Sequence, residues 1–110
     1  MNKKRNQQLA DGIKDFLIAY ELNYDTRIYF NNKCYDFDSQ GNIKIIDGIK
    51  GSDYFEYAND ETVSMSFEGP LYMVLNHGPV NIERKFSEVF NKHGMYYELG
   101  NTWNLAAFEG

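Results

Sequence analysis

The spacing of apolar residues changes from helix-like to strand-like along the chain, and this change limits the fold more than any other feature. Near the N-terminus five apolar residues recur every three or four positions: Leu9, Ile13, Phe16, Leu17 and Tyr20. Such spacing predicts a helix over residues 6–22 with one apolar face. Over residues 62–67 apolar and polar side chains instead alternate, which predicts a strand with one buried face.

Short apolar runs separated by turn residues predict further strands. Asn, Asp and Gly cluster between these runs, as is typical of tight turns. The expected strands cover residues 27–30, 34–37, 43–47 and 54–57. A final hairpin is expected from strands over 95–99 and 102–108, with its turn at Gly100-Asn101.

Two more helices are expected between the alternating strand and the final hairpin. Pro70 suits the first position of a short helix over 70–77, and Gly78 suits its end. Asn81 is a favourable N-cap for a longer helix that ends at Gly94. Strands and helices that are grouped rather than alternating indicate the α+β class. We therefore expect an antiparallel sheet, a meander plus a C-terminal hairpin, packed against two longer helices and one short helix.

The length of 110 residues corresponds to one domain, because a single domain commonly has this size. We expect one α+β domain over residues 1–110, with residues 1–5 flexible. Cys34 is the one cysteine, and no apolar stretch resembles a signal peptide or a membrane span. These features predict a cytoplasmic protein.

Charge is unevenly distributed along the chain. The formal net charge is −5, and no Lys or Arg occurs between Gly51 and Glu83. Direct binding to nucleic acid is not expected, because neutralising phosphates requires clustered cations. An acidic surface suits a basic protein partner, or serves solubility alone. The residues expected to form an acidic binding face are Asp47, Asp53, Glu56, Asp60, Glu61 and Glu68.

The sequence contains little evidence for a catalytic site. Cys34, His77 and His93 lack the paired spacing of a zinc site, so neither a metal nor a cofactor is expected. Cys34 lies in an expected strand, where a cysteine is more often a small core residue than a nucleophile. Asp36 and Asp38 share one face of a strand, which leaves a small carboxylate and histidine hydrolase as a distant alternative.

Tyrosine is abundant, with nine residues in the chain, which is more than a small core needs. Exposed tyrosines supply apolar contact area and a hydroxyl together, as is typical of binding surfaces. The alternative site is therefore aromatic, and it would serve as a binding or self-association module. Its expected residues are Tyr54, Tyr57, Tyr96 and Tyr97.

Two stretches resemble a known group of proteins. They are SMSFEGPLYMVLN at residues 64–76 and YYELGNTWNL at residues 96–105. Together they resemble small acidic accessory proteins carried on bacterial integrative and conjugative elements, where such proteins lie among antirestriction genes. The resemblance implies a mobile-element context and contains no catalytic motif.

These observations favour a non-catalytic interaction protein that presents an acidic face to a basic partner protein. A nucleic-acid-binding enzyme is one such partner, because carboxylates on a rigid β scaffold can imitate a row of phosphates. This would make the chain an accessory protein of the anti-defence or antirestriction kind. The aromatic binding module or homodimer remains the alternative.

Overall fold

The computed structural model describes residues 2–110. Its helices are α1 (Lys3–Ala19), α2 (Pro70–His77) and α3 (Val80–Asn91), with one 3-10 turn, η1 (Gly51–Asp53). Its strands are β1 (Thr26–Phe30), β2 (Lys33–Phe37), β3 (Ile43–Asp47), β4 (Val63–Phe67), β5 (Met95–Asn101) and β6 (Asn104–Glu109). No helix within residues 2–110 combines the length and the apolar content that crossing a bilayer requires.

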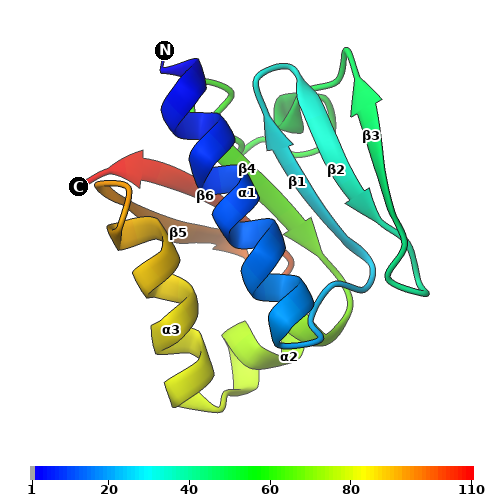
Figure 1. The fold of residues 1–110 in the computed structure, drawn as a ribbon, viewed down its shortest axis with the longest axis vertical. Helices are drawn as coiled ribbons and strands as arrows, with labels where there is room; N and C mark the ends of the chain where they lie inside the picture. The colour runs from blue at the N-terminus through cyan, green and yellow to red at the C-terminus, as the bar shows by residue number, and fades with distance from the viewer. Residues whose placement is uncertain (1) are drawn as a thin grey trace.

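All the strands belong to one six-stranded antiparallel sheet, in the order β3-β2-β1-β4-β6-β5. The helices α1 and α3 lie side by side on one face of this sheet, in front of it in Figure 1. The α+β class with three helices packed against an antiparallel sheet is therefore confirmed. The meander is confirmed for β1 to β3, whereas β4 pairs with β1 rather than with β3.

The main core lies between the helices and the sheet. Apolar residues from α1 and α3 meet inward-facing residues of β1, β4 and β6; the fully buried ones include Leu9, Ile13, Leu17, Ile28, Met65, Phe86, Phe90 and Leu105. Because side chains alternate along a strand, this packing leaves the other half of each strand on the opposite face. We call that opposite face, turned away from α1 and α3, the open face.

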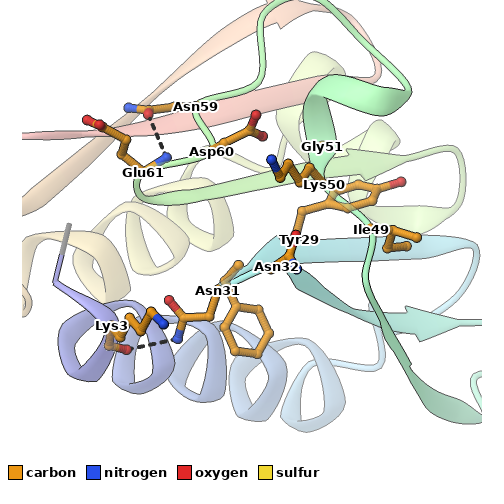
Figure 2. A pocket seen from close by; sticks show the side chains of 11 residues that line it. Lys3, Tyr29, Asn31, Asn32, Ile49, Lys50, Gly51, Asn59, Asp60 and Glu61 are labelled. Carbon is orange, nitrogen blue, oxygen red and sulfur yellow. Dashed lines mark hydrogen bonds between the residues drawn. The ribbon is translucent and has the colours of Figure 1, made fainter.

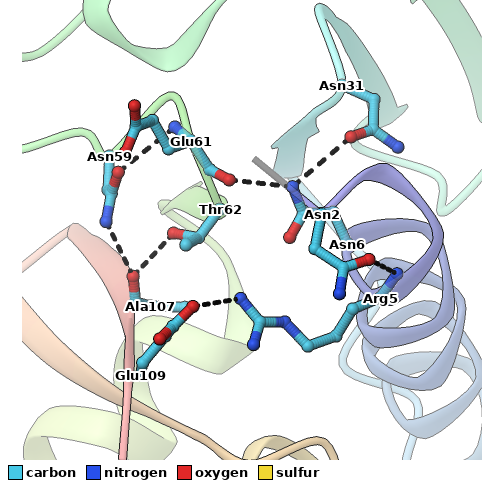
Figure 3. Close-up of polar contacts among 9 residues, drawn as sticks. All are labelled: Asn2, Arg5, Asn6, Asn31, Asn59, Glu61, Thr62, Ala107 and Glu109. Atoms are coloured by element: carbon cyan, nitrogen blue, oxygen red, sulfur yellow. Dashed lines mark hydrogen bonds and ion pairs between the residues drawn. The ribbon is translucent and has the colours of Figure 1, made fainter.

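The first helix begins earlier than the hydrophobic spacing predicts. Asn2 caps it, with its side-chain oxygen accepting a hydrogen bond from the Arg5 backbone N–H at 2.9 Å. Arg5 also pairs with Glu109 of β6 at 2.8 Å (Figure 3). Lys3 to Arg5 thus belong to α1 and Asn2 caps it, whereas the flexibility expected for residues 1–5 stays a prediction; Met1 lies outside the described residues.

The short helix over 70–77 is confirmed, with Pro70 at its first position. The second long helix begins at Val80, one residue before the expected cap Asn81, because Pro79 takes the N-cap position. It ends at Asn91, and Gly94 has a φ of +71°, which favours glycine and turns the chain into β5.

Two expectations for the strands are wrong. Residues 54–57 form no strand; they belong to a loop that follows η1 and packs on the open face. The final turn lies at Thr102-Trp103, because Gly100 and Asn101 belong to β5, where the register shifts between Leu99 and Asn101. A Cβ on Gly100 would lie 2.6 Å from the Tyr57 ring, so glycine there permits close packing rather than a turn.

Candidate functional site

A loop over residues 48–62 covers part of the open face. Phe55 anchors this loop, since its side chain is buried against Tyr29 and Cys34 in a second, smaller apolar cluster. The Phe55 ring lies 5.9 Å from the Tyr29 ring and 6.0 Å from the Trp103 ring, both in edge-to-face geometry. Two adjoining hollows on the open face meet at Tyr54 and Trp103, which line both of them.

The first hollow, here named the acidic hollow, has a volume of about 510 Å³. Its charged lining residues are Asp25, Arg27, Asp36, Asp38 and Glu68. Four carboxylates against one guanidinium give this lining a formal charge of −3. Asp36 and Arg27 face each other across β1 and β2, and the rest lie at strand ends. The pairing of antiparallel strands thus gathers carboxylates that are distant in sequence.

Arg27 is the cation in the lining of the acidic hollow. Its Nη2 lies 3.3 Å from Oδ2 of Asp36, and its Nη1 donates to the Tyr29 hydroxyl at 3.4 Å. Its guanidinium lies 5.3 Å from the centre of the Tyr54 ring, within range of a cation–π interaction. The hydrogen bond to Tyr29 and the neighbouring Asp36 charge raise the pKa of Arg27 above its ordinary value. The open face thus already holds one guanidinium between a carboxylate and an aromatic ring.

Asp38 keeps its charge because of the backbone around it. The backbone N–H groups of Asn42 and Gln40 donate to its Oδ1 at 3.0 and 2.8 Å. These hydrogen bonds lower the pKa of Asp38 below its ordinary value. A carboxyl group held in its ionised form suits a binding role, whereas a general acid needs a raised pKa.

The second hollow, here named the aromatic hollow, has a volume of about 600 Å³. The side chains that line it include Tyr54, Phe55, Glu56, Tyr57, Trp103 and Asn104. The Tyr57 hydroxyl donates to Oε1 of Glu98 at 2.7 Å, which fixes the orientation of the Tyr57 ring. Glu56 is exposed at this hollow and is the charged residue in its lining.

Asn104 is the unusual polar residue of the aromatic hollow. Its side chain is 2% exposed, and its Oδ1 has no hydrogen-bond partner within residues 2–110. A buried carbonyl oxygen without a donor costs about 1–3 kcal/mol relative to a satisfied one. The oxygen itself is buried and lies against Gly100, since a Cβ at Gly100 would be 2.4 Å from it, so a ligand reaches it only if the amide rotates.

Comparisons of the chain with protein-family models, with curated proteins and with solved structures found no match. The geometry of the open face is therefore the basis for the function proposed below.

The structure divides the six predicted acidic residues among several places. Glu68 lines the acidic hollow and Glu56 the aromatic hollow, whereas Asp60 and Glu61 line a third one. Asp53 accepts the Lys50 backbone N–H at 2.9 Å, and Asp47 ends the edge strand β3. The six thus share no single hollow, and their common acidic face stays a prediction; three of the four carboxylates of the acidic hollow come from residues before the cation-free window.

The third hollow lies between the start of α1, the β1–β2 turn and the loop over 48–62, with a volume of about 330 Å³ (Figure 2). Lys3 and Lys50 line it together with Asp60 and Glu61, so its lining carries no net charge. Asp60 is already engaged, accepting hydrogen bonds from the backbone and the hydroxyl of Ser52. This hollow therefore lacks the excess negative charge of the acidic hollow.

The four predicted tyrosines do not all lie on the same face of the sheet. Tyr54 and Tyr57 line the aromatic hollow, and Tyr96 lies on the exposed side of β5 with its ring 5.9 Å from the Phe108 ring. Tyr97 points to the helices instead, with its ring 5.1 Å from the Phe90 ring. Tyr97 is thus corrected to a side chain packed on the main core, because neighbouring residues of a strand face opposite ways.

The residues considered for catalysis are kept apart. Cys34 is buried, and this burial raises the pKa of its thiol to about 12, as expected for an inert core cysteine. Asp36 and Asp38 line the acidic hollow, whereas His77 ends α2 and His93 follows α3. The His93 ring contacts the Val89 carbonyl oxygen at 3.0 Å. Within residues 2–110 no three histidine, cysteine or acidic side chains are grouped to hold a metal.

Asp25, Arg27 and Trp103, which line the acidic hollow, are not among the candidate site residues predicted from the sequence. One signal was present: Arg27 and Asp36 each lie on the polar side of an alternating strand, and opposite charges on neighbouring strands are expected to pair. Trp103 gave no signal, because its position beside Tyr54 depends on the long-range packing of β6 against β4 and of the 48–62 loop on the open face.

Proposed function

We propose that this chain is a non-catalytic interaction protein whose open face binds a basic segment of a partner protein. The observation that carries the proposal is the acidic hollow, where four carboxylates and one guanidinium line a single depression. A concave surface of one charge sign attracts oppositely charged partners and speeds their association.

The chemistry of the lining supports a cationic ligand. Carboxylates pair with lysine and arginine, while tyrosine and tryptophan rings attract cations through their faces. Tyr54 and Trp103 lie where the acidic and aromatic hollows meet, so both kinds of interaction are available along one path. The contacts of Arg27 with Asp36 and Tyr54 are an internal example of the same recognition.

Calorimetric titration with a short peptide that alternates lysine and glycine tests the proposal. The decisive variant is Asp25→Asn with Glu68→Gln, because it removes two charges from the acidic hollow and keeps Asp38 in its turn. We expect this variant to bind about tenfold more weakly, and the affinity of the native chain to fall as salt rises.

The matched control removes the same charge from the helical side. Asp15 of α1 and Glu88 of α3 are both exposed there, so Asp15→Asn with Glu88→Gln changes net charge equally. We expect the control to bind like the native chain. Equal weakening in both variants would show that net charge alone attracts the peptide, and absence of binding to the native chain would remove the proposal.

Self-association is a second candidate, favoured by the edge strand β3. Ile43 and Ile45 are 43% and 61% exposed there, and β3 ends the sheet, so its outer edge has no strand neighbour within residues 2–110. An exposed apolar edge strand readily pairs with another strand. Sedimentation of the native chain and of Ile45→Lys tests this: a native dimer that the variant abolishes supports the candidate, and a native monomer at high concentration removes it.

A further inference from the structure

The aromatic hollow combines aromatic rings, a carboxylate and a buried amide oxygen. Tyr54, Tyr57 and Trp103 supply aromatic rings, Glu56 supplies a carboxylate, and Asn104 supplies a buried carbonyl oxygen without a donor. The rings are held in place by their neighbours: Tyr57 by Glu98, and Trp103 by the edge of Phe55. An open hollow lined by aromatic rings and one carboxylate is suited to a single cationic side chain.

From this combination we infer that the aromatic hollow is a recognition pocket for one arginine side chain of the partner. The inference rests on the proposed function, because it names the group of the basic segment that enters this pocket. The hollow adjoins the acidic hollow at Tyr54 and Trp103, so a segment lying along the carboxylates reaches both.

Asn104 distinguishes between the kinds of cation that the hollow could bind. A quaternary ammonium group satisfies aromatic rings but has no N–H to donate, so it would leave the Asn104 Oδ1 without a partner. Asn104 lines the hollow, but its Oδ1 is itself buried, and we expect rotation about its Cβ–Cγ bond, a torsion with broad minima, to present this oxygen when a donor enters.

Arginine fits this lining better than lysine. A guanidinium is planar, stacks on aromatic faces and has five N–H donors, enough for Glu56 and Asn104 together. An ammonium group is more strongly hydrated and loses more hydration free energy when it leaves water to contact the rings. The arrangement of Arg27 beside Tyr54 and Asp36 provides the same pairing of ring and carboxylate in the adjoining acidic hollow.

The sole tryptophan of the chain, Trp103, reports directly on occupancy of the pocket. The probes are the lysine–glycine peptide and three forms in which its central lysine is replaced by arginine, citrulline or trimethyllysine. We expect the arginine form to shift the Trp103 emission and to bind about tenfold more tightly than the lysine form, a difference of about 1.4 kcal/mol. The citrulline form lacks the charge and should show no gain.

Two variants test whether the tighter binding of the arginine peptide depends on the aromatic hollow. Calorimetry with Trp103→Leu and with Asn104→Ser should show that the arginine and lysine peptides bind equally. Tyr96→Leu, which removes an exposed ring outside this pocket, should retain the preference for arginine. Circular dichroism confirms that each variant is folded. If Asn104→Ser fails to fold, Trp103→Leu with its 36% exposed site still decides the outcome.

The outcomes separate the two proposals. Equal binding of arginine and lysine peptides to the native chain would overturn the arginine pocket while leaving the basic-segment proposal in place. A gain of the same size with trimethyllysine would overturn the role of Asn104 and the assignment of arginine. Failure of every peptide to bind would remove the proposed function itself, and the pocket assignment with it.

Discussion

The guanidinium of Arg27 lies 3.3 Å from the carboxylate of Asp36, across the β1–β2 pair on the open face. Their side chains are 31% and 16% exposed, so the pair is partly screened and contributes at most about 1 kcal/mol to stability. Its larger consequence concerns binding, because Arg27 neutralises one of the four carboxylates that line the acidic hollow.

Replacing this internal cation should therefore improve binding. We expect Arg27→Gln to bind the lysine–glycine peptide about threefold to tenfold more tightly, because Asp36 and the Tyr54 face become available to the ligand. Calorimetric titration at fixed salt measures the change. Lys85→Gln, on the exposed side of α3, is the matched control for net charge. An unchanged affinity for Arg27→Gln would place the peptide elsewhere on the molecule.

Gly100 should tolerate no side chain. A Cβ at this position would lie 2.4 Å from the Oδ1 of Asn104 and 2.6 Å from the Tyr57 ring. We expect Gly100→Ala to lower the free energy of unfolding by about 1–3 kcal/mol, as overpacking commonly does. Urea denaturation measures it, with Gly12→Ala in α1 as the control, because the nearest side-chain atom would lie 3.4 Å from that Cβ and alanine favours a helix. A Gly100→Ala variant as stable as the native chain would contradict the close approach of Tyr57 to β5.

Alkaline pH should weaken the fold partly through Tyr35. Burial, followed by the hydrogen bond to Asp11 at 2.6 Å, raises the pKa of Tyr35 to about 12 from an ordinary value of 10. The folded chain therefore holds this proton more tightly than the unfolded chain does. The resulting stability is fully present below pH 10 and is lost as pH rises toward 12.

The variant Tyr35→Phe isolates this contribution. We expect it to cost about 1 kcal/mol at pH 7, because the hydrogen bonds of the hydroxyl to Asp11 and Gln7 are lost. Between pH 10 and 12 its stability should decline less steeply than that of the native chain, with Tyr29 and Tyr97 accounting for part of the remaining decline, since burial raises their pKa values too. Identical slopes in urea melts across this range would refute the assignment.

Phe55 should control access to Cys34. The two side chains are buried in the same small cluster under the loop over 48–62. We expect Phe55→Ala to make the Cys34 thiol react several-fold faster with an aromatic disulfide reagent at pH 8, because water reaches the thiol and its raised pKa falls. Tyr96→Ala removes a ring far from this cluster and should react at the native rate. Equal rates for both variants would mean that the loop does not shield Cys34.

Local patterns were sufficient for the helices and most strands. Alternation placed β4 within one residue, and Pro70 marked the start of α2, because these signals act over a few neighbouring positions. The conformation of the loop over 48–62 was harder to predict from the sequence. Its aromatic residues indicated a strand, but Phe55 instead packs on Tyr29 on the open face, a long-range contact that no local pattern encodes.

The candidate site depended on pairings that no local pattern encodes. The order of the strands places β4 beside β1, and this brings Glu68 to the same hollow as Asp36. The cation-free stretch was a sound signal of negative charge but a poor guide to position, since Asp53 and Asp60 are used in hydrogen bonds within their own loop. Asp25 and Asp38 lie at strand ends and show their relation only once the sheet is assembled.

Nuclear magnetic resonance mapping tests the central claim most directly. Adding the arginine-containing peptide to isotopically labelled protein should shift the amide signals of residues 25–29, 54–57, 66–68 and 100–104, which surround the acidic and aromatic hollows. The signals of α1 and α3 should stay in place. Shifts confined to the helices, or spread evenly over the whole surface, would contradict a binding site on the open face.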